Sequence, residues 1–321
     1  MKNLATEDLD NVSDSTSQEV AELGAETLRR VERLVDRIGG QLGSLAIDLF
    51  ERHGYQVSAE GGGPHRNVLG HPLIELPVWL ARVPSDDLSV GDQALHDICE
   101  SSLCGYLSVR AEDDYFDGHW DDPHAAMMLS SLFRTRHLAL LAPLIDDQRF
   151  WERCGTVWTR YAEAMLVERS LHDPAGEYGP AQFELILDRS QPLEIPGGAV
   201  LSIKGRWDAS EALGAMVRHL TRATQLFDDF VDAPEDLATG NYTWMIRRLG
   251  GMNGAAALRR GMVTSWDSVR EEAVLALTEA QNIAEILEIR EMSGWIDQRQ
   301  RVMADASERM YRALFDSLGS S

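Results

Sequence analysis

The sequence predicts an all-α protein, and three observations carry this prediction. Large apolar residues recur at steps of three and four along almost the whole chain of 321 residues, which is the period of an amphipathic helix. The alternation of apolar and polar residues that indicates a half-buried strand is almost absent. No internal repeat and no proline-rich linker divides the sequence, so we expect one helical domain over residues 19–321.

The first half of the chain divides at glycines and prolines. Residues 1–18 are acidic and rich in Ser and Thr, and we interpret them as a disordered acidic tail because they offer little apolar surface to bury. Gly39 and Gly40 end the first periodic segment, and Pro84 breaks the chain before a long one. The apolar segments of this half cover residues 20–38, 41–53, 73–83, 92–118, 123–145 and 147–172.

The second half contains one irregular region and then more helix. Prolines and glycines are frequent over residues 173–196, which we expect to form loops. The helical period resumes at Gly198 and continues with interruptions to Leu318. Pro234 lies inside this stretch, and we expect it to kink its helix because proline lacks the N–H group and its ring clashes with the preceding turn.

The charge and the apolar stretches exclude several classes of function. The chain has 30 Lys and Arg against 52 Asp and Glu, a formal net charge of −22, so we expect no nucleic-acid partner. The longest apolar stretch, residues 138–145, is too short to cross a bilayer, and no signal pattern begins the sequence. Cys99, Cys104 and Cys154 fit no disulfide framework or zinc motif. We therefore expect a cytoplasmic protein without integral membrane association.

The first candidate site is an acidic cluster at residues 112–117, Glu-Asp-Asp-Tyr-Phe-Asp, at the end of an otherwise apolar helix. Asp113 and Asp117 are one helical turn apart and face the same way, with Asp114 beside them. Like charges at this spacing destabilise a helix unless a cation lies between them. Mg²⁺ prefers hard oxygen ligands and keeps positions for phosphate, so the cluster predicts either a magnesium site or a solvated acidic face.

A second cluster favours the magnesium site over the solvated face. Asp228 and Asp232 are again one turn apart, with Asp229 adjacent, and Asp236 follows one turn later. Gln225 lies on the same helical face. Two acidic elements of this form, each on a long apolar helix, are hard to explain as solvated acidic faces alone. They predict two opposite lips of one cavity that holds several Mg²⁺ ions and a diphosphate.

These motifs resemble those of the class I isoprenoid synthases, the superfamily of the trans-prenyltransferases and the class I terpene cyclases. The resemblance rests on Asp-Asp-Tyr-Phe-Asp at residues 113–117, on Gln-Leu-Phe-Asp-Asp-Phe-Val-Asp at residues 225–232, and on Lys204 in the helix upstream of the second cluster. It implies a helical bundle around a central active-site cavity, a prenyl diphosphate substrate, about three Mg²⁺ ions and a homodimer.

The resemblance also implies roles for individual residues. The catalytic, metal-binding aspartates would be Asp113, Asp117, Asp228 and Asp232. The full set of metal ligands would be Asp113, Asp114, Asp117, Gln225, Asp228, Asp229, Asp232 and Asp236. The diphosphate would contact Lys204, Arg206, Arg222 and Arg312. The wall of the cavity would include Tyr106, Val109, Phe227 and Trp244.

The branch of the superfamily depends on a second diphosphate site. In the elongating enzymes a Gly-Lys-x-x-Arg-Pro loop and an Arg-Arg-Gly after the first aspartate cluster bind isopentenyl diphosphate. Here residues 63–67 read Gly-Pro-His-Arg-Asn, and residues 118–122 are acidic where the elongating enzymes are basic. This difference favours a terpene synthase that ionises farnesyl or geranylgeranyl diphosphate, rearranges the carbocation to a terpene and releases diphosphate.

Two alternatives remain. The first is a trans-prenyltransferase, which either elongates a polyprenyl diphosphate or transfers the prenyl group to an acceptor other than isopentenyl diphosphate. The second is an inactive partner subunit that has kept the fold. The aspartates present in both clusters argue against an inactive subunit, because a decayed site should lose at least one of them.

Overall fold

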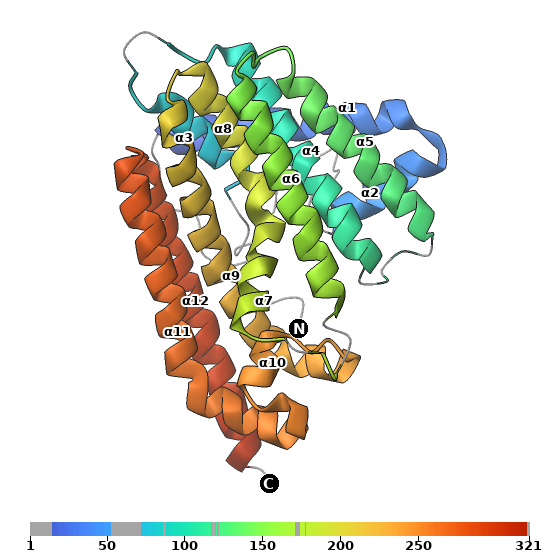
Figure 1. Ribbon diagram of the computed structural model, residues 1–321, viewed down its shortest axis with the longest axis vertical. Coiled ribbons are helices and arrows are strands. Elements are labelled where there is room, and N and C mark those ends of the chain that lie inside the picture. The colour runs from blue at the N-terminus through green and yellow to red at the C-terminus, as the bar shows by residue number, and fades with distance from the viewer. Residues whose placement is uncertain are drawn as a thin grey trace. The chain divides into compact units, whose positions relative to one another are not determined.

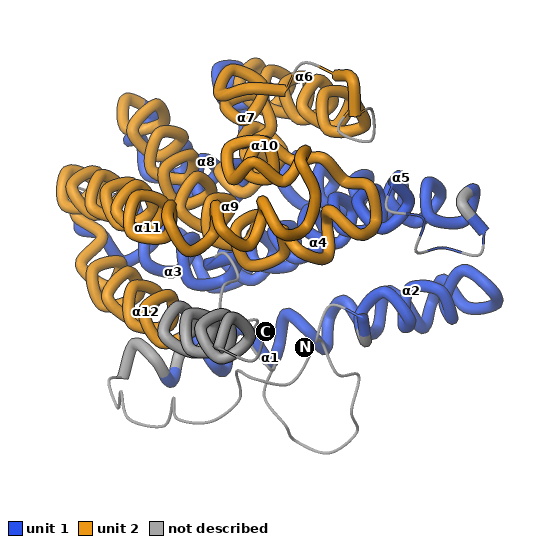
Figure 2. The backbone as a smooth tube through the Cα atoms, turned by 90° about the horizontal axis from the view of Figure 1, so that it is seen from below, with its two compact units in different colours: residues 1–150, 195–207 blue, residues 151–194, 208–321 orange. Residues whose placement is uncertain are grey.

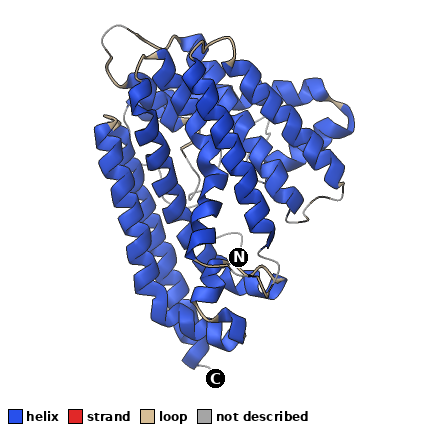
Figure 3. Ribbon diagram, in the orientation of Figure 1, coloured by secondary structure: helices blue, strands red, loops and turns tan. Residues whose placement is uncertain are grey.

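The structure is a computed structural model, and its described part is helical, with no strand among the residues it describes (Figure 3). This confirms the predicted all-α class. The described residues are 15–52, 72–85, 88–116, 118, 120, 122–170, 174–176 and 178–319. At residues 15–17, 19, 51, 123 and 306–319 it describes the backbone alone. No helix within these ranges is both long and apolar enough to cross a membrane.

The chain divides into two compact units, coloured separately in Figure 2. Residues 1–150 and 195–207 form the first unit, and residues 151–194 and 208–321 form the second. The helices of the first unit are α1 (Ser15–Ile38), α2 (Gly40–Arg52), α3 (Glu75–Arg82), α4 (Asp92–Phe116), α5 (Pro123–Leu141) and nearly all of α8 (Glu194–Ile203). Those of the second are nearly all of α6 (Gln148–Arg169), then α7 (Pro180–Ile186), α9 (Ser210–Thr239), α10 (Trp244–Arg248), α11 (Ala255–Ile286) and α12 (Arg290–Gly319).

In the first unit, α4 packs along α5 and also contacts α1, α2 and α3 (Figure 1). Helix α5 begins where the sequence predicted, because Pro123 occupies its first position and the Asp122 carboxylate accepts hydrogen bonds from two backbone N–H groups of the first turn. The apolar side chains between these helices are buried and include Val31, Leu49, Phe50, Leu107, Leu129 and Phe133.

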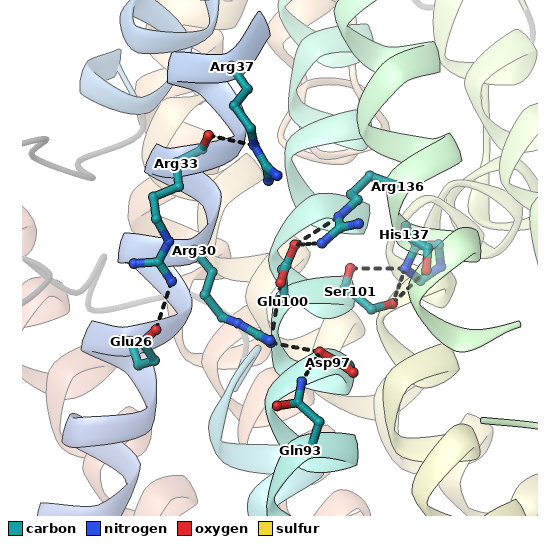
Figure 4. Close-up of polar contacts among 10 residues, drawn as sticks. All are labelled: Glu26, Arg30, Arg33, Arg37, Gln93, Asp97, Glu100, Ser101, Arg136 and His137. Carbon is teal, nitrogen blue, oxygen red and sulfur yellow. Dashed lines mark hydrogen bonds and ion pairs between the residues drawn. The ribbon is translucent and has the colours of Figure 1, made fainter. Parts of the chain in front are cut away.

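Buried polar groups also join α1, α4 and α5 (Figure 4). The carboxylate of Glu100 is 2% exposed and forms ion pairs with Arg30, at 3.3 Å, and with Arg136, at 2.5 Å. The Ser101 hydroxyl lies 2.8 Å from Nδ1 of His137, and burial lowers the pKa of that histidine to about 4. A buried carboxylate held between two arginines is costly to unpair, so this network fixes how α1 and α5 meet α4.

The second unit is built around α9, which packs along α11, while α11 also contacts α12. Helix α9 runs without interruption through Pro234 and ends at Gly240, which has a φ of 80° and caps the helix in the left-handed region. The predicted kink at Pro234 does not end the helix, and Asp236 lies on the same helix as Asp232. Pro234 is exposed and removes only one N–H donor, so the rest of α9 stays packed against α11.

The prediction of loops over residues 173–196 was wrong over most of its length. Helix α7 spans residues 180–186, a 3₁₀ helix labelled η2 (Leu187–Leu193) follows it, and α8 then begins at Glu194. Gly179 precedes the helix and Pro180 takes its first position. Proline interrupts a helix in its interior but is favoured at the first position, where its missing N–H would have no partner within the helix. Phe183 and Ile186 are buried, so packing within the second unit supports a helix too short to be recognised from its period.

Gly261 on α11 is a place where the second unit tolerates no side chain. A Cβ atom there would lie 1.9 Å from the backbone carbonyl oxygen of Leu249, and backbone cannot move aside cheaply. We expect Gly261→Ala to lower the free energy of unfolding by about 3 kcal/mol, measured by urea denaturation. The matched control is Gly294→Ala on α12, where a Cβ meets nothing within 4 Å. It should raise stability by about 0.5–1 kcal/mol, and equal effects of the two changes would contradict the packing.

Candidate functional site

The first acidic cluster lies at the C-terminal end of α4, in the first unit. Glu112 faces α5, where its carboxylate accepts a hydrogen bond from Ser130, at 2.6 Å, and pairs with Arg134, at 2.7 Å. Its side chain is 11% exposed. Glu112 is therefore part of the contact between α4 and α5, and its partners on α5 fix the last turn of α4 that carries the aspartates.

Each of the two aspartates that follow is paired with an arginine. Nη1 of Arg110 lies 2.6 Å from Oδ2 of Asp113, three residues along the same helix. Nη1 of Arg52, at the end of α2, lies 2.9 Å from Oδ2 of Asp114, whose side chain is only 3% exposed. The predicted ligand Asp117 lies outside the described residues. The sequence analysis did not identify either arginine, although the three-residue spacing of Arg110 and Asp113 is a visible signal.

The second acidic cluster lies on α9, in the second unit. Nε2 of Gln225 donates a hydrogen bond of 2.6 Å to Oδ1 of Asp229, one turn away. Asp229 is 9% exposed, and burial raises its pKa to about 6, with a further contribution from the charge of Asp232. Gln225 and Arg189 oppose this shift because both stabilise the ionised carboxylate. Asp232 itself is exposed and Asp228 is half-buried.

Asp236 belongs electrostatically to the same cluster. Its pKa rises to about 7, first because of burial and then because of the negative charge of Asp229. Nδ2 of Asn241, just beyond the end of α9, donates to Oδ1 of Asp236 at 3.2 Å and counteracts this effect. Pro234 therefore does not remove Asp236 from the cluster. Asn241 is a functional candidate that the sequence patterns did not reveal.

A second layer of polar residues lies against the acidic face of α9. Arg189, on η2, forms an ion pair with Glu168 and donates to Oε1 of Gln225 at 3.4 Å, so a positive charge lies behind the amide that holds Asp229. The buried phenol of Tyr178 has a raised pKa, because of burial and then the nearby Asp229. Nothing in the local sequence marks Arg189 or Tyr178, because both come from the region that was expected to form loops.

Two of the predicted diphosphate residues, Lys204 and Arg222, contact other parts of the protein. Lys204 is buried, and its Nζ donates to the backbone oxygens of Ala81, at 2.8 Å, and Val83, where α3 ends. Burial, and then the charge of Arg206, lowers the pKa of Lys204. Arg222 pairs with Glu184 of α7. The side chain of Arg312 is not among those described. The diphosphate role of all four residues stays a prediction.

The predicted cavity residues come from both units. Tyr106 and Val109 are half-buried on α4, in the first unit. In the second unit, Phe227 contacts Trp266 with ring centroids 6.5 Å apart and borders a small pocket of about 200 Å³ between α9, α11 and α12. Trp244 packs on Phe183 of α7, with ring centroids 4.9 Å apart. Phe227 is therefore on the α11 side of α9, whereas Gln225 and Asp229 face η2.

The donor set on α9 fits a hard divalent cation. Burial is the main reason that the pKa values of Asp229 and Asp236 are raised, and the charge of Asp229 adds to the shift at Asp236, so ionising both carboxylates without a counter-ion is unfavourable. A bound Mg²⁺ would offset this cost through oxygen ligands of the kind it prefers. In the described part of the chain, no three His, Cys, Asp or Glu side chains converge closely enough to hold a metal alone.

Comparisons with known proteins identify the fold. No family model and no curated protein sequence matches the chain. A polyprenyl synthase from Caulobacter crescentus, crystallised with calcium and isoprenyl diphosphate, is similar with a TM-score of 0.62 and 18% identity, over 92% of this chain and 98% of that one. The geranylgeranyl pyrophosphate synthetase of the archaeon Geoglobus acetivorans gives a TM-score of 0.66 and 13% identity, over 91% and 99%.

The heptaprenyl diphosphate synthase of Staphylococcus aureus is a third similar structure, with a TM-score of 0.56 and 12% identity, over 94% of this chain and 99% of that one. The chain thus shares the all-helical fold of these three synthases over more than nine-tenths of its length, at identities of 12–18%. All three neighbours are named as synthases of prenyl diphosphates or polyprenyl chains.

Asp236 offers a direct test of the charge balance on α9. Its pKa of about 7 in the folded protein lies above the ordinary value of 3.8, so the metal-free protein should lose stability as the pH rises from about 4 through 7. We expect Asp236→Asn to remove this loss and to be more stable than wild type by about 1 kcal/mol or more at pH 8 in EDTA, with no difference at pH 4. Thermal melts across this range measure the effect. An equal gain at both pH values would contradict the assigned cause.

Proposed function

We propose that the protein is a metal-dependent prenyltransferase that uses an allylic prenyl diphosphate as its donor. The observation that carries this proposal is that the chain corresponds in fold, over more than nine-tenths of its length, to three prenyl diphosphate synthases, and carries an aspartate cluster on α4 and another on α9. The sequence alone favoured a terpene synthase. The structural neighbours support the alternative.

The two clusters supply the ligands in this proposal. Asp113 and Asp117 on one side, and Asp228, Asp229 and Asp232 on the other, would hold the divalent ions, about three Mg²⁺ in all. The ions supply charge neutralisation for the departing diphosphate. Asp236 adds charge to the second cluster. Arg222, Lys204, Arg206 and Arg312 are the proposed cationic contacts of the diphosphate.

The remaining chemistry belongs to the substrates and to the protein around them. The allylic C–O bond breaks with its electron pair leaving on the diphosphate, the acceptor supplies the electron pair of the new bond, and the acceptor then loses a proton. Gln225 has one role in this scheme, because its amide fixes the Asp229 carboxylate in a single orientation. Arg189 holds that amide from behind, so the ligand oxygen is positioned before substrate binds.

The acceptor is the point on which two candidate functions differ. The connection after α4 carries acidic residues, and Asp122 in it is committed to capping α5. The sequence of this connection, residues 118–122, contains no arginine pair that could bind a second diphosphate. We therefore propose an acceptor other than isopentenyl diphosphate, and the same observation keeps terpene cyclisation as the second candidate. We further propose that the enzyme acts as a cytoplasmic homodimer, as the resemblance implies.

Product analysis separates the candidates. We expect the purified protein with Mg²⁺ to consume farnesyl or geranylgeranyl diphosphate rapidly only when an acceptor is present, with isopentenyl diphosphate and aromatic nucleophiles as the acceptors tested. Mass spectrometry would identify the prenylated product. A hydrocarbon or terpene alcohol formed quickly from the donor alone would contradict the proposal and establish the cyclase.

Variants tie that activity to the clusters. Asp113→Asn and Asp229→Asn should each lower kcat by about 100-fold or more, because each removes a charged ligand whose effect grows as the diphosphate departs. Glu285→Gln, an exposed carboxylate on α11, is the matched control and should change kcat little. Circular dichroism would show that the helices persist. Full activity in either aspartate variant would remove that cluster from the site.

A further inference from the structure

Asp113 and Asp114 are neighbours in sequence, but their arginine partners differ in how firmly they are held. Arg110 reaches Asp113 from one turn earlier on α4, and the two side chains are 31% and 15% exposed. Arg52 reaches Asp114 from α2, and its guanidinium also lies over the ring of Trp120, 4.4 Å from the centroid. Asp114 is 3% exposed. Arg52 is itself 34% exposed, so the two ion pairs differ in their carboxylates and in their span. Asp113 is the more accessible carboxylate and its partner lies on the same helix, whereas the partner of Asp114 comes from a separate helix.

A carboxylate oxygen bound by a guanidinium is not available to a metal ion in the same geometry. A divalent cation beside that oxygen would also repel the guanidinium, because two like charges within a few ångströms oppose each other. A cation that binds through Oδ2 of Asp113 must therefore displace Arg110 from that oxygen. The Arg110–Asp113 pair is part-buried, so we expect its loss to cost about 1 kcal/mol, the upper end of the range for exposed ion pairs.

Asp114 is in the opposite situation. Its carboxylate is nearly inaccessible, and removing Arg52 would leave a buried charge without its partner, which is strongly unfavourable. The stacking of Arg52 on Trp120 gives the guanidinium a second contact that a metal ion would not replace. Arg52 therefore links the end of α2 and the ring of Trp120 to Asp114.

We infer that Arg110 is a built-in counter-ion that occupies Asp113 until a divalent cation displaces it, while Arg52 holds Asp114 permanently as a structural anchor. This inference rests on the proposed function, since it requires a cation to bind at Asp113. The exchange keeps the charge of the cluster balanced in the metal-free protein. Its consequence is a weaker affinity for the metal, because binding includes the loss of the Arg110 ion pair.

The metal affinity of the free protein tests this directly. We would titrate Mn²⁺ into the full-length protein by calorimetry and by electron paramagnetic resonance, without substrate. Arg110→Gln should tighten binding at the site that depends on Asp113 by about fivefold, the factor that corresponds to about 1 kcal/mol for releasing this ion pair. Arg110→Lys keeps the charge and should tighten it less. In an Asp113→Asn background, Arg110→Gln should have no effect.

The two other arginines are the controls. Arg52→Gln should not tighten Mn²⁺ binding, and it should lower the melting temperature, because Asp114 loses its partner. Arg33→Gln removes an equal charge from an exposed ion pair with Glu26 on α1 and should change neither property. Tightening by Arg33→Gln as large as that by Arg110→Gln would show a general charge effect and overturn the inference.

The remaining outcomes are distinguishable. Unchanged or weaker Mn²⁺ binding in Arg110→Gln, with binding that still depends on Asp113, would overturn the counter-ion role and leave the proposed function intact. If Asp113→Asn leaves Mn²⁺ binding of the otherwise wild-type protein unchanged, the first cluster is not a metal site, and both the inference and that part of the proposed function fail.

Discussion

The structure depends on balancing carboxylate charge inside helices that are otherwise apolar. Asp114 and Asp229 are both nearly buried, and an ionised carboxylate in such a place is unfavourable unless a partner compensates it. The two clusters meet this constraint differently. On α4 the aspartates are paired with arginines, whereas on α9 an amide and a more distant arginine compensate Asp229 only in part, and its pKa remains raised.

In the proposed mechanism, this difference gives the two clusters different roles. The α9 carboxylates are held in place with only partial compensation of their charge, so a bound cation would stabilise their ionised forms. The α4 carboxylate Asp113 is neutralised in advance and must exchange its partner. The α9 arrangement depends on the continuity of this helix through Pro234, which keeps Gln225, Asp229 and Asp236 along one helical face.

The helical class, the approximate bounds of the helices in the first half of the chain and the two acidic clusters could be predicted from the sequence, because periodicity and one-turn spacing are local properties. Helix α4 was expected over residues 92–118 and spans 92–116. Partners from distant segments could not be predicted: Arg52, Arg189 and Asn241 reach the aspartates only through the packing of their helices. Helix α7 was missed because seven residues show too little period and Pro180 was interpreted as a breaker. The lack of a second diphosphate site was predicted from absent motifs, and absent motifs do not identify what takes the place of that site.

The central claim is that both aspartate clusters act on one metal-bound diphosphate. Calorimetric titration of inorganic diphosphate into the wild-type protein, with Mg²⁺ and then with EDTA, tests it most directly, alongside Asp113→Asn and Asp229→Asn. The account predicts binding that requires Mg²⁺ and that weakens by about tenfold or more in each variant, since each removes one charged ligand. Diphosphate binding that is equally strong in EDTA, or unaffected by either substitution, would contradict it.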